Sequence, residues 1–529
     1  MHNPGLGPCY NPLSMLSDTA QNPEQLLGPL KLTPQRRAWI TAGVMMGLFL
    51  SALEATAVVT AMPTVISSLG GLEFYSWVYS IYFLTATVSV PLWGRLSDFY
   101  GRRLFYIAGI GLFVGGSVLC GLSQSMGQLV AFRAIQGLGA GALLPLGMTI
   151  VGDIYSLERR ARMQGWFSGV WGLSSILGPL LGGLITDHLS WRWVFFLNIP
   201  FGLLAGTIIA LALVEPRSRR DSRVDYLGVL LLIVSLSLLL VSLDQFKDGE
   251  PTPGKSLALI TAVILLALFV FQQRRTADPI LPLHLFNDRM FSAAALNGLF
   301  SGMALFGAIS FIPLFVQGVL GTGATEAGWA ITPLMLGWVV FSIVGGRLIL
   351  IVGYRRTVIA GMVSLSIGFF LLSRITAQVS PFELGMVLVL MGTGMGLSMV
   401  SMLIAVQNRF PRSYLGIATS ATQFFRTIGA SIGIVIMGAV MAGQMMSGLS
   451  ALEATEQTEQ IAYVARHPDM IVNPLNRAQI SPDLLPKLQE LLGMALQDVF
   501  FVGFIFSLLA LASAFLVPPG SAQQNARRE

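Results

Sequence analysis

Long apolar runs alternate with short polar connections along almost the whole chain. The runs are roughly 18 to 28 residues long, and a helix needs about 20 apolar residues to cross the hydrocarbon core of a membrane. Unpaired backbone groups are costly in lipid and the short alternation of a β-barrel is absent, so each run predicts a membrane-spanning helix. The fourteen predicted spans are about 39–62, 75–94, 104–122, 128–151, 164–186, 194–214, 225–243, 256–273, 291–317, 325–352, 357–375, 382–406, 415–443 and 494–517.

Composition supports a polytopic membrane protein. Hydrophobic side chains make up 54% of the 529 residues and charged ones 11%, against about 25% charged residues in soluble proteins. Cys9 lies in the N-terminal segment and Cys120 in a span, which supports neither a disulfide framework nor a thiolate metal site. The four histidines are scattered without ligand spacing, so we expect no metal and no cofactor.

Basic residues predict the orientation, because Lys and Arg concentrate in short cytoplasmic loops. With the N-terminus inside, the predicted cytoplasmic segments hold 23 Lys and Arg residues and the outer segments hold 7. An odd number of spans would mix these basic residues between the two sides of the membrane. The number of spans is therefore expected to be even, with both termini cytoplasmic. The net charge of +6 is then a topology signal, and we expect no nucleic-acid binding.

A repeated sequence divides the chain. GRLSDFYGRR at 94–103 follows the second predicted span, and GRLILIVGYR at 346–355 follows the tenth, at an offset of 252 residues. The repeat predicts two parallel six-helix bundles, at about 38–214 and 290–517, that face each other around a midplane cavity, as in alternating-access carriers.

Four segments are predicted besides the helices of these bundles. Residues 215–289 are predicted to be a linker with two extra spans, and 444–493 an extracellular loop whose second half looks weakly helical. Residues 1–37, which are rich in proline, and 518–529 are predicted to be cytoplasmic tails, the first of them flexible and without signal-peptide features.

Three ionisable side chains lie well inside predicted spans: Glu54, Arg133 and Arg426. Each costs roughly 2.5 to 3.5 kcal/mol or more at the centre of a membrane helix, so each should face the bundle interior and have a partner or a function. Glu54 is the only deep acid among the 26 Asp and Glu residues. A carboxyl in apolar surroundings can hold a proton near neutral pH, and alternate exposure to the two sides would make it a proton carrier.

Several motifs resemble those of the major facilitator superfamily. GRLSDFYGRR is similar to its loop signature, RAIQGLGAGALLP at 133–145 to its fourth-helix signature, and GLSSILGPLLGG at 172–183 to the fifth-helix signature of its antiporters. WRWVFFLNIPFG at 191–202, PILPLHLF at 279–286 and QFFRTIGASIG at 423–433 resemble its fourteen-span drug/proton antiporter branch. The resemblance extends over both halves and implies an all-α fold.

The loop signature implies a cytoplasmic gate formed by Gly94, Asp98, Gly101, Arg102 and Arg103. Gly94 would permit close helix approach, and the charged groups would pair only while the inner side is closed. A basic topology loop with one neutralising Asp is the alternative.

The fifth-helix signature implies a smooth groove formed by Gly172, Gly178, Pro179, Gly182 and Gly183, which would close against the opposite half and seal the cavity. Glycine is common in all membrane helices, so this groove could equally serve ordinary packing. The segment at 191–202 is expected to be a structural anchor at the membrane interface.

The resemblance also implies proton coupling through Glu54, since the family carries an acid at this place, usually Asp followed by Thr two residues later; here Thr56 follows. Arg133 would tune the protonation of that acid. The residues alone leave alternatives open: Glu54 fixed in a pair with Arg133 or Arg426, and Arg133 bonded structurally to Gln136 or to backbone carbonyls.

The predicted function is export of hydrophobic, cationic or neutral compounds against a proton gradient, by a monomeric multi-pass protein of the cell (inner) membrane whose partners are substrates, protons and lipids. An exporter or flippase of lipids or anionic amphiphiles, and a membrane sensor without transport, are the alternatives. Enzyme motifs are absent, so no catalysis is expected. Candidate residues of the substrate cavity are Glu54, Tyr82, Trp171, Asn297, Gln317, Gln407, Asn408, Gln423 and Arg426.

Overall fold

The computed structural model describes residues 32–155, 157–214, 225–244, 253–276, 279–410, 415–456 and 480–519, and the regular structure in these ranges is helical. The predicted all-α fold is therefore confirmed. The elements are α1 (Pro34–Leu69), η1 (Leu72–Phe74), α2 (Tyr75–Tyr100), α3 (Arg102–Gly121), α4 (Met126–Ile154), α5 (Leu157–His188), α6 (Arg192–Phe196), α7 (Asn198–Ala212), α8 (Tyr226–Asp244), α9 (Pro253–Arg275), η3 (Leu283–Asn287), α10 (Arg289–Leu314), the π-helix η4 (Phe315–Val319), α11 (Ala324–Ile351), α12 (Tyr354–Leu372), α13 (Pro381–Arg409), α14 (Leu415–Glu456) and α17 (Leu484–Ala514).

Polar side chains mark where several helices begin. The Thr33 hydroxyl accepts the N–H of Arg36 at the start of α1. At the start of α13, Ser380 and Glu383 form a capping box with Pro381 in the first turn. Such caps satisfy N–H groups that a helix leaves unpaired at its N-terminus, which fixes the point where each helix begins.

Thirteen helical segments in the described ranges are long and apolar enough to cross a membrane. The predicted span at 75–94 forms α2, which is of similar length but more polar because its first turns carry Tyr75, Ser76, Tyr79 and Ser80. α2 packs against α4 and α14 inside the bundle, so its polar face is covered by protein. Each of the fourteen predicted spans thus corresponds to a helical segment, with α6 and α7 together forming the sixth.

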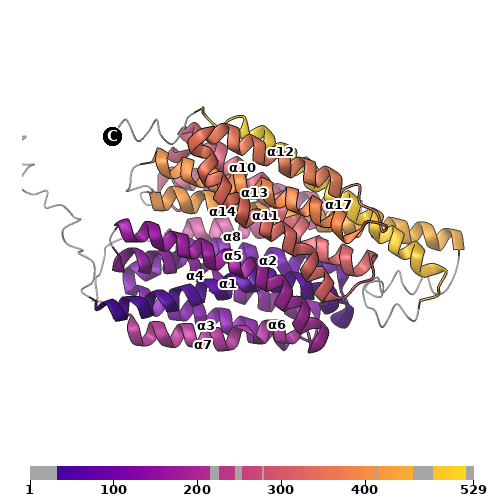
Figure 1. The fold of residues 1–529 in the computed structure, drawn as a ribbon, viewed down its shortest axis with the longest axis horizontal. Coiled ribbons are helices and arrows are strands. Elements are labelled where there is room, and N and C mark those ends of the chain that lie inside the picture. The colour runs from indigo at the N-terminus through magenta and orange to yellow at the C-terminus, as the bar shows by residue number, and fades with distance from the viewer. Residues whose placement is uncertain are drawn as a thin grey trace, which may run out of the picture.

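Helices α1–α7 form one half of the molecule and α10–α17 form the other (Figure 1). The repeat is visible in the backbone: Gly101 joins α2 to α3 with φ 101°, and Gly353 joins α11 to α12 with φ 84°. Only glycine adopts this left-handed region freely, so the same turn stands at the same point of each half.

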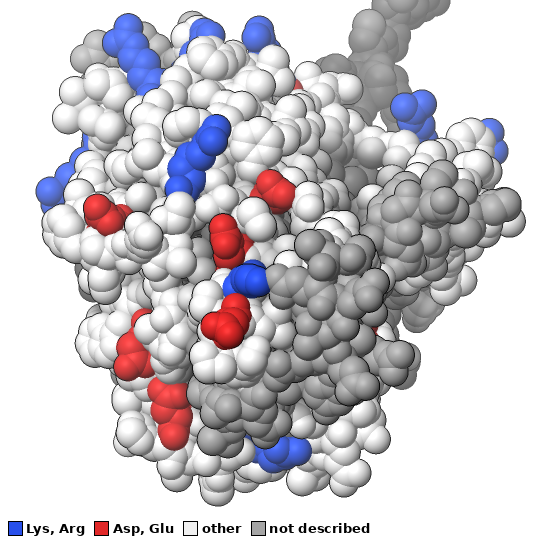
Figure 2. All heavy atoms as spheres, turned by 90° about the vertical axis from the view of Figure 1, so that its right-hand side faces the viewer, with Lys and Arg blue, Asp and Glu red and all other residues white. Residues whose placement is uncertain are grey.

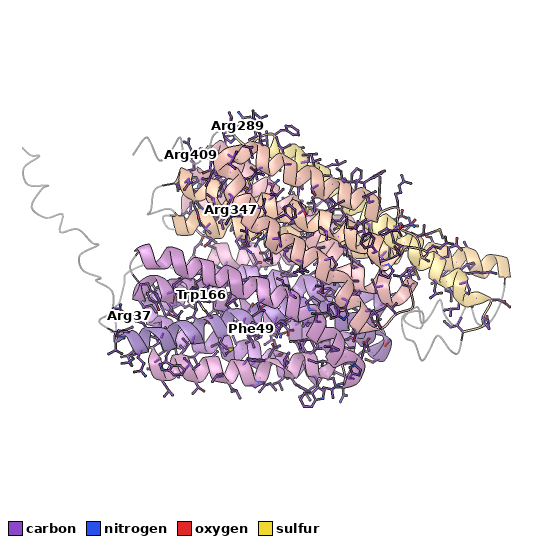
Figure 3. All side chains as sticks on the ribbon, viewed as in Figure 1. Arg37, Phe49, Trp166, Arg289, Arg347 and Arg409 are labelled. Carbon is purple, nitrogen blue, oxygen red and sulfur yellow. The ribbon has the colours of Figure 1, made fainter. Side chains whose placement is uncertain are left out.

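The two ends of the bundle differ. Arg37, Arg289 and Arg409 lie toward one end, on the left of Figure 3, which we call the basic end. Arg289 Nε donates to the Leu516 carbonyl oxygen at 3.0 Å, so α17 ends beside the start of α10. The first and last helices therefore begin and end at the same side, as an even number of crossings requires. Figure 2 looks onto the opposite, far end, where acidic and basic side chains both lie among the described atoms.

The two extra helices, α8 and α9, pack against each other, and α8 lies between the halves in contact with α2 and α14 (Figure 1). Asp225, just before α8, accepts hydrogen bonds from Gln272 and Gln273 at the end of α9, both at 2.7 Å. These bonds tie the hairpin together at its base.

The connection predicted at 444–493 needs correction, because helix occupies both of its ends. α14 continues to Glu456 and α17 already begins at Leu484, so the two helices project beyond their neighbours at the far end (Figure 1). Buried Met445, Leu449 and Leu488 give this extension an apolar seam. The predicted helical character of the second half is confirmed, whereas 457–479 lies outside the described residues, as do 1–31, 215–224 and 520–529 of the predicted tails and linker.

Candidate functional site

Glu54 lies inside α1 with only 1% of its surface exposed. Nearby on the same helix, the Thr56 hydroxyl donates to the Ser174 carbonyl oxygen of α5 at 3.2 Å. This bond helps to hold α1 against α5, so the carboxylate projects from a helix with a fixed position. A buried carboxylate needs partners, and helices α4 and α7 provide them.

Arg133 of α4 is the charged partner. Its Nη1 donates to Glu54 Oε1 at 2.7 Å and to Gln136 Oε1 at 2.7 Å, and its Nε donates to the Val78 carbonyl oxygen at 3.2 Å. The guanidinium carbon lies 4.1 Å from the centroid of the Tyr82 ring, a cation–π arrangement. Both bonding roles considered for Arg133, to the acid and to Gln136 with a backbone carbonyl, are present together.

Asn198, at the start of α7, is a member of this cluster that the sequence did not single out. Its Nδ2 donates to Glu54 Oε2 at 2.5 Å and to Ser117 Oγ of α3 at 2.9 Å. Asn198 belongs to the segment 191–202, which was expected to be structural, and its hydrogen bonds link that segment to Glu54. A lone amide within an apolar run was the available signal, since a buried amide demands partners.

The second arginine does not join this cluster. Arg426 Nη2 donates to Gln423 Oε1, one turn away on α14. Of the two candidates, Arg133 is therefore the base that pairs with Glu54. The sequence between Glu383 and Glu453 contains no Asp or Glu, so no acid of that stretch compensates the charge of Arg426.

The glycine face of α5 packs in two directions. A Cβ on Gly178 would overlap the Thr56 hydroxyl, and a Cβ on Gly182 would overlap the Ala57 carbonyl oxygen, so these glycines let α1 approach within the same half. A Cβ on Gly183 would lie 2.5 Å from the Ala324 carbonyl oxygen of α11, in the opposite half. Gly172, further toward the basic end, faces Val339 of α11, so both ends of this glycine face meet the other half. The sealing role of the face stays a prediction.

Hydrogen bonds between the halves lie toward the far end, where the ribbons draw together (Figure 1). Gln317 Nε2 of the π-helix η4 donates to the Thr60 carbonyl oxygen of α1 at 2.9 Å. Asp187, at the end of α5, accepts the N–H groups of Ala324 and Thr325 at 3.1 and 2.7 Å. Asp187 thereby caps the N-terminus of α11 from the opposite half, and the far end is closed.

At the basic end the gate motif makes contacts within its own half. Arg102 Nη1 lies 2.5 Å from Asp153 Oδ2, at the end of α4. A Cβ on Gly94 would meet no atom within 4 Å, so the expected close helix approach at Gly94 is not made in this conformation. The side chain of Asp98 lies outside the described residues. Arg103 is exposed, and the gate role stays a prediction.

The candidate cavity residues do not share one environment. Asn297 is 3% exposed and donates to the Ala510 carbonyl oxygen of α17 at 2.9 Å, so it ties helices of one half together. Asn408 is exposed and donates to the Tyr354 hydroxyl at 2.7 Å. Partly exposed groups are Trp171, Gln407, Gln423 and Arg426, whereas Tyr82 is buried under Arg133 and Gln317 belongs to the far-end contact.

The structure has two six-helix halves, the same turn glycine in each half and a buried acid–arginine pair. A comparison of the sequence with protein families agrees with these features. The profile described as Major Facilitator Superfamily matches residues 44–434. The chain belongs to the major facilitator superfamily.

Relatives of this transporter agree with that assignment. It is 35% identical over 509 residues to the multidrug transporter protein MdtP of Bacillus subtilis (strain 168), covering 91% of this chain and 93% of that protein. It is 33% identical over 482 residues to multidrug resistance protein 3 of the same organism, covering 89% and 93%. These relatives are membrane transporters, and the chain is therefore a multi-pass membrane transporter.

Solved structures show the same fold. A bacterial homologue of the human lysosomal transporter Spinster, in an inward-facing and unoccupied conformation, aligns with a TM-score of 0.66 at 16% identity, covering 92% of this transporter and 97% of that chain. An auto-inhibited peptide transporter of the POT family aligns with a TM-score of 0.60 at 15% identity, covering 94% and 97%. At such identities the likeness extends to the fold alone.

Proposed function

We propose that this transporter exports hydrophobic, cationic or neutral compounds across the cell membrane in exchange for protons, with Glu54 as the proton-carrying group. The observation that carries the proposal is the buried cluster in which Glu54 contacts both Arg133 and Asn198. The names of the relatives, a multidrug transporter and a multidrug resistance protein, support the substrate class.

The cluster provides a site whose electrostatics depend on one proton. Ionised Glu54 and Arg133 are neutral as a pair, and a proton on Glu54 leaves the guanidinium as an uncompensated cation in a region of low dielectric constant. The Val78 carbonyl, Gln136 and the Tyr82 ring still hold Arg133 in place. Proton loading therefore changes the charge of the first half without releasing the arginine.

Exchange requires that proton and substrate favour different conformations. Glu54 lies on α1, and the same helix carries Thr60, whose carbonyl accepts the hydrogen bond from Gln317 of the opposite half. We assign α1 as the element that relates the protonation of Glu54 to the far-end closure. The proton would enter when the far end is open and leave toward the basic end.

The charged groups inside the bundle indicate which charge the substrate carries. A lipophilic cation would compete with the proton for Glu54, and a single deep acid favours monovalent over divalent cations. Arg426 is partly exposed and bonded to the neutral Gln423, which favours a second candidate, export of anionic amphiphiles or lipids on the same fold.

Transport assays on proteoliposomes test the proposal. With an imposed pH gradient and ethidium as the cationic probe, we expect Glu54→Gln to lower gradient-driven exchange to the level without a gradient, because glutamine cannot carry the proton. The acid-retaining Glu54→Asp should keep part of the exchange, and Glu490→Gln, at an exposed acid of α17, should keep all of it.

Two outcomes would count against this account. Full coupling in Glu54→Gln would remove the carrier role from Glu54. Gradient-driven movement of a fluorescent anionic amphiphile, with no movement of ethidium, would replace the first candidate with the second. Thermal unfolding of each purified variant checks that loss of exchange does not follow from loss of fold.

A further inference from the structure

We infer that Asn198 is a positioning residue that satisfies both protonation states of Glu54, and that the proton of neutral Glu54 sits on Oε2, the oxygen facing Asn198. This inference rests on the proposed role of Glu54 as the proton carrier. The Asn198 amide would donate to Oε2 of the ionised carboxylate and accept from the O–H of the neutral acid.

The two carboxylate oxygens of Glu54 face chemically different neighbours. Oε1 accepts from Arg133 Nη1 at 2.7 Å, and a guanidinium has only donors and stays charged. A proton on Oε1 would point at another donor. Oε2 accepts from Asn198 Nδ2 at 2.5 Å, and an asparagine amide carries an acceptor beside its donors. Only Oε2 can therefore gain a proton and still find an acceptor.

The switch requires a half-turn of the Asn198 amide. When the incoming proton bonds to Oε2, the amide turns over so that Oδ1 replaces Nδ2 and accepts the new O–H; no other covalent bond forms or breaks. Ser117 can follow this turn, because its hydroxyl now accepts from Nδ2 at 2.9 Å and donates to the Phe195 carbonyl at 2.8 Å. A rotated hydroxyl would donate to Oδ1 instead, since a serine hydroxyl serves in both roles.

The other groups around Glu54 do not replace Asn198 as the acceptor for the O–H of the neutral acid. The titratable groups that interact with it are Arg133 of α4, Tyr82 of α2 and Cys120 of α3. The Tyr82 ring faces the guanidinium, and Cys120 Sγ donates to Gln136 Oε1 at 3.7 Å. Gln136 is a second amide beside Glu54, but its Oε1 already accepts from Arg133 at 2.7 Å and from Cys120 at 3.7 Å. Asn198 is therefore the amide that can turn over without giving up a bond from Arg133.

Infrared difference spectroscopy of the purified transporter, titrated between acid and alkaline pH, tests the inference. The carboxyl band that disappears in Glu54→Gln belongs to Glu54. In Asn198→Leu this band should move to higher frequency, because the O–H loses its acceptor. Its titration midpoint should rise by about one pH unit, since a hydrogen bond to a charged group is roughly twice as strong as a neutral one.

Asn297→Leu is the matched control, because Asn297 is a buried amide of the other half that bonds to Ala510 and Ser398. It should lower stability and leave the Glu54 band unmoved. If leucine disturbs packing at 198, Asn198→Asp keeps the side-chain shape and should raise the midpoint by more than one unit, as two carboxyls share a proton. An unchanged band in both Asn198 variants would overturn the inference, whereas absence of any band removed by Glu54→Gln would instead overturn the proposed carrier.

Discussion

At the scale of residues, Glu54 and Arg133 form a buried ion pair. The interaction between them is measured by replacing each partner alone and both together. Removing one partner of such a pair costs about 3–5 kcal/mol, because the other charge stays buried without compensation. The remaining contacts of Arg133, to Val78 and Gln136, do not supply an opposite charge.

We therefore expect Arg133→Met to lower the unfolding temperature of the purified protein strongly, and Glu54→Gln added to it to restore most of the loss. Thermal unfolding of the two single variants and the double variant gives the coupling free energy, which we expect to be at least about 1 kcal/mol. Additive losses would mean that the two side chains do not interact in the folded protein.

The sequence predicted two members of this cluster and left the rest open. The cost of burying charge singled out Glu54 and Arg133, because ionisable groups in membrane spans are rare. It could not choose between Arg133 and Arg426 as the partner, since that choice depends on how α1, α4 and α14 are placed in space. Asn198 carries the same signal as Asn297, a lone amide in an apolar run, but its place in the interfacial segment 191–202 predicted a structural role.

At the scale of elements, α5 is one of the helices that contact both halves. Gly178 meets Thr56 of α1, whereas Gly183 meets Ala324 of α11. A Cβ at either position would overlap or crowd its neighbour. Because one neighbour lies in the same half and the other in the opposite half, the two substitutions should change different properties. Gly169 of the same helix has no atom within 4 Å of a Cβ position and serves as the control.

Gly183→Ala should push α5 from α11 and open the far end, whereas Gly178→Ala should lower stability without opening it and Gly169→Ala should do neither. Electron–electron distance measurements between spin labels at Glu73→Cys and Glu326→Cys, on opposite halves of the far end, would report the opening in a background carrying Cys9→Ser. An unchanged distance distribution in Gly183→Ala would contradict a closing role for this face.

Asp187 supplies a second test of the same closure. Its carboxylate caps two N–H groups at the start of α11 and carries a negative charge where the helix dipole is positive. Asp187→Ala should cost the closed state about 1 kcal/mol, which is roughly a fivefold change in the ratio of closed to open molecules. The same spin-label pair measures that ratio, and a ratio equal to that of the unsubstituted protein would show that the cap does not stabilise closure.

The sequence predicted most elements, because a hydrophobic run of membrane length has one structural solution. One misjudgement came from using apolarity alone. The ends of 444–493 are helical because α14 and α17 cover each other beyond their spans. The gate roles of Gly94 and Asp98 stay predictions.

At the scale of the whole molecule, the repeat, the basic end and the far-end contacts describe a two-half transporter closed on one side. The offset of 252 residues between the loop motifs predicted the duplication, and the turns at Gly101 and Gly353 confirm it in the backbone. Which end is closed could not be read from the sequence, since it depends on contacts between halves.

The central claim is that Glu54 exchanges its proton for substrate, and substrate-induced proton release tests it most directly. Unbuffered purified protein is mixed with ethidium at a pH where Glu54 is largely protonated, and the released protons are counted with a pH indicator. The account predicts release of up to about one proton per bound ethidium from the unsubstituted protein and from Glu490→Gln, and none from Glu54→Gln. Equal release from Glu54→Gln and the unsubstituted protein would contradict it.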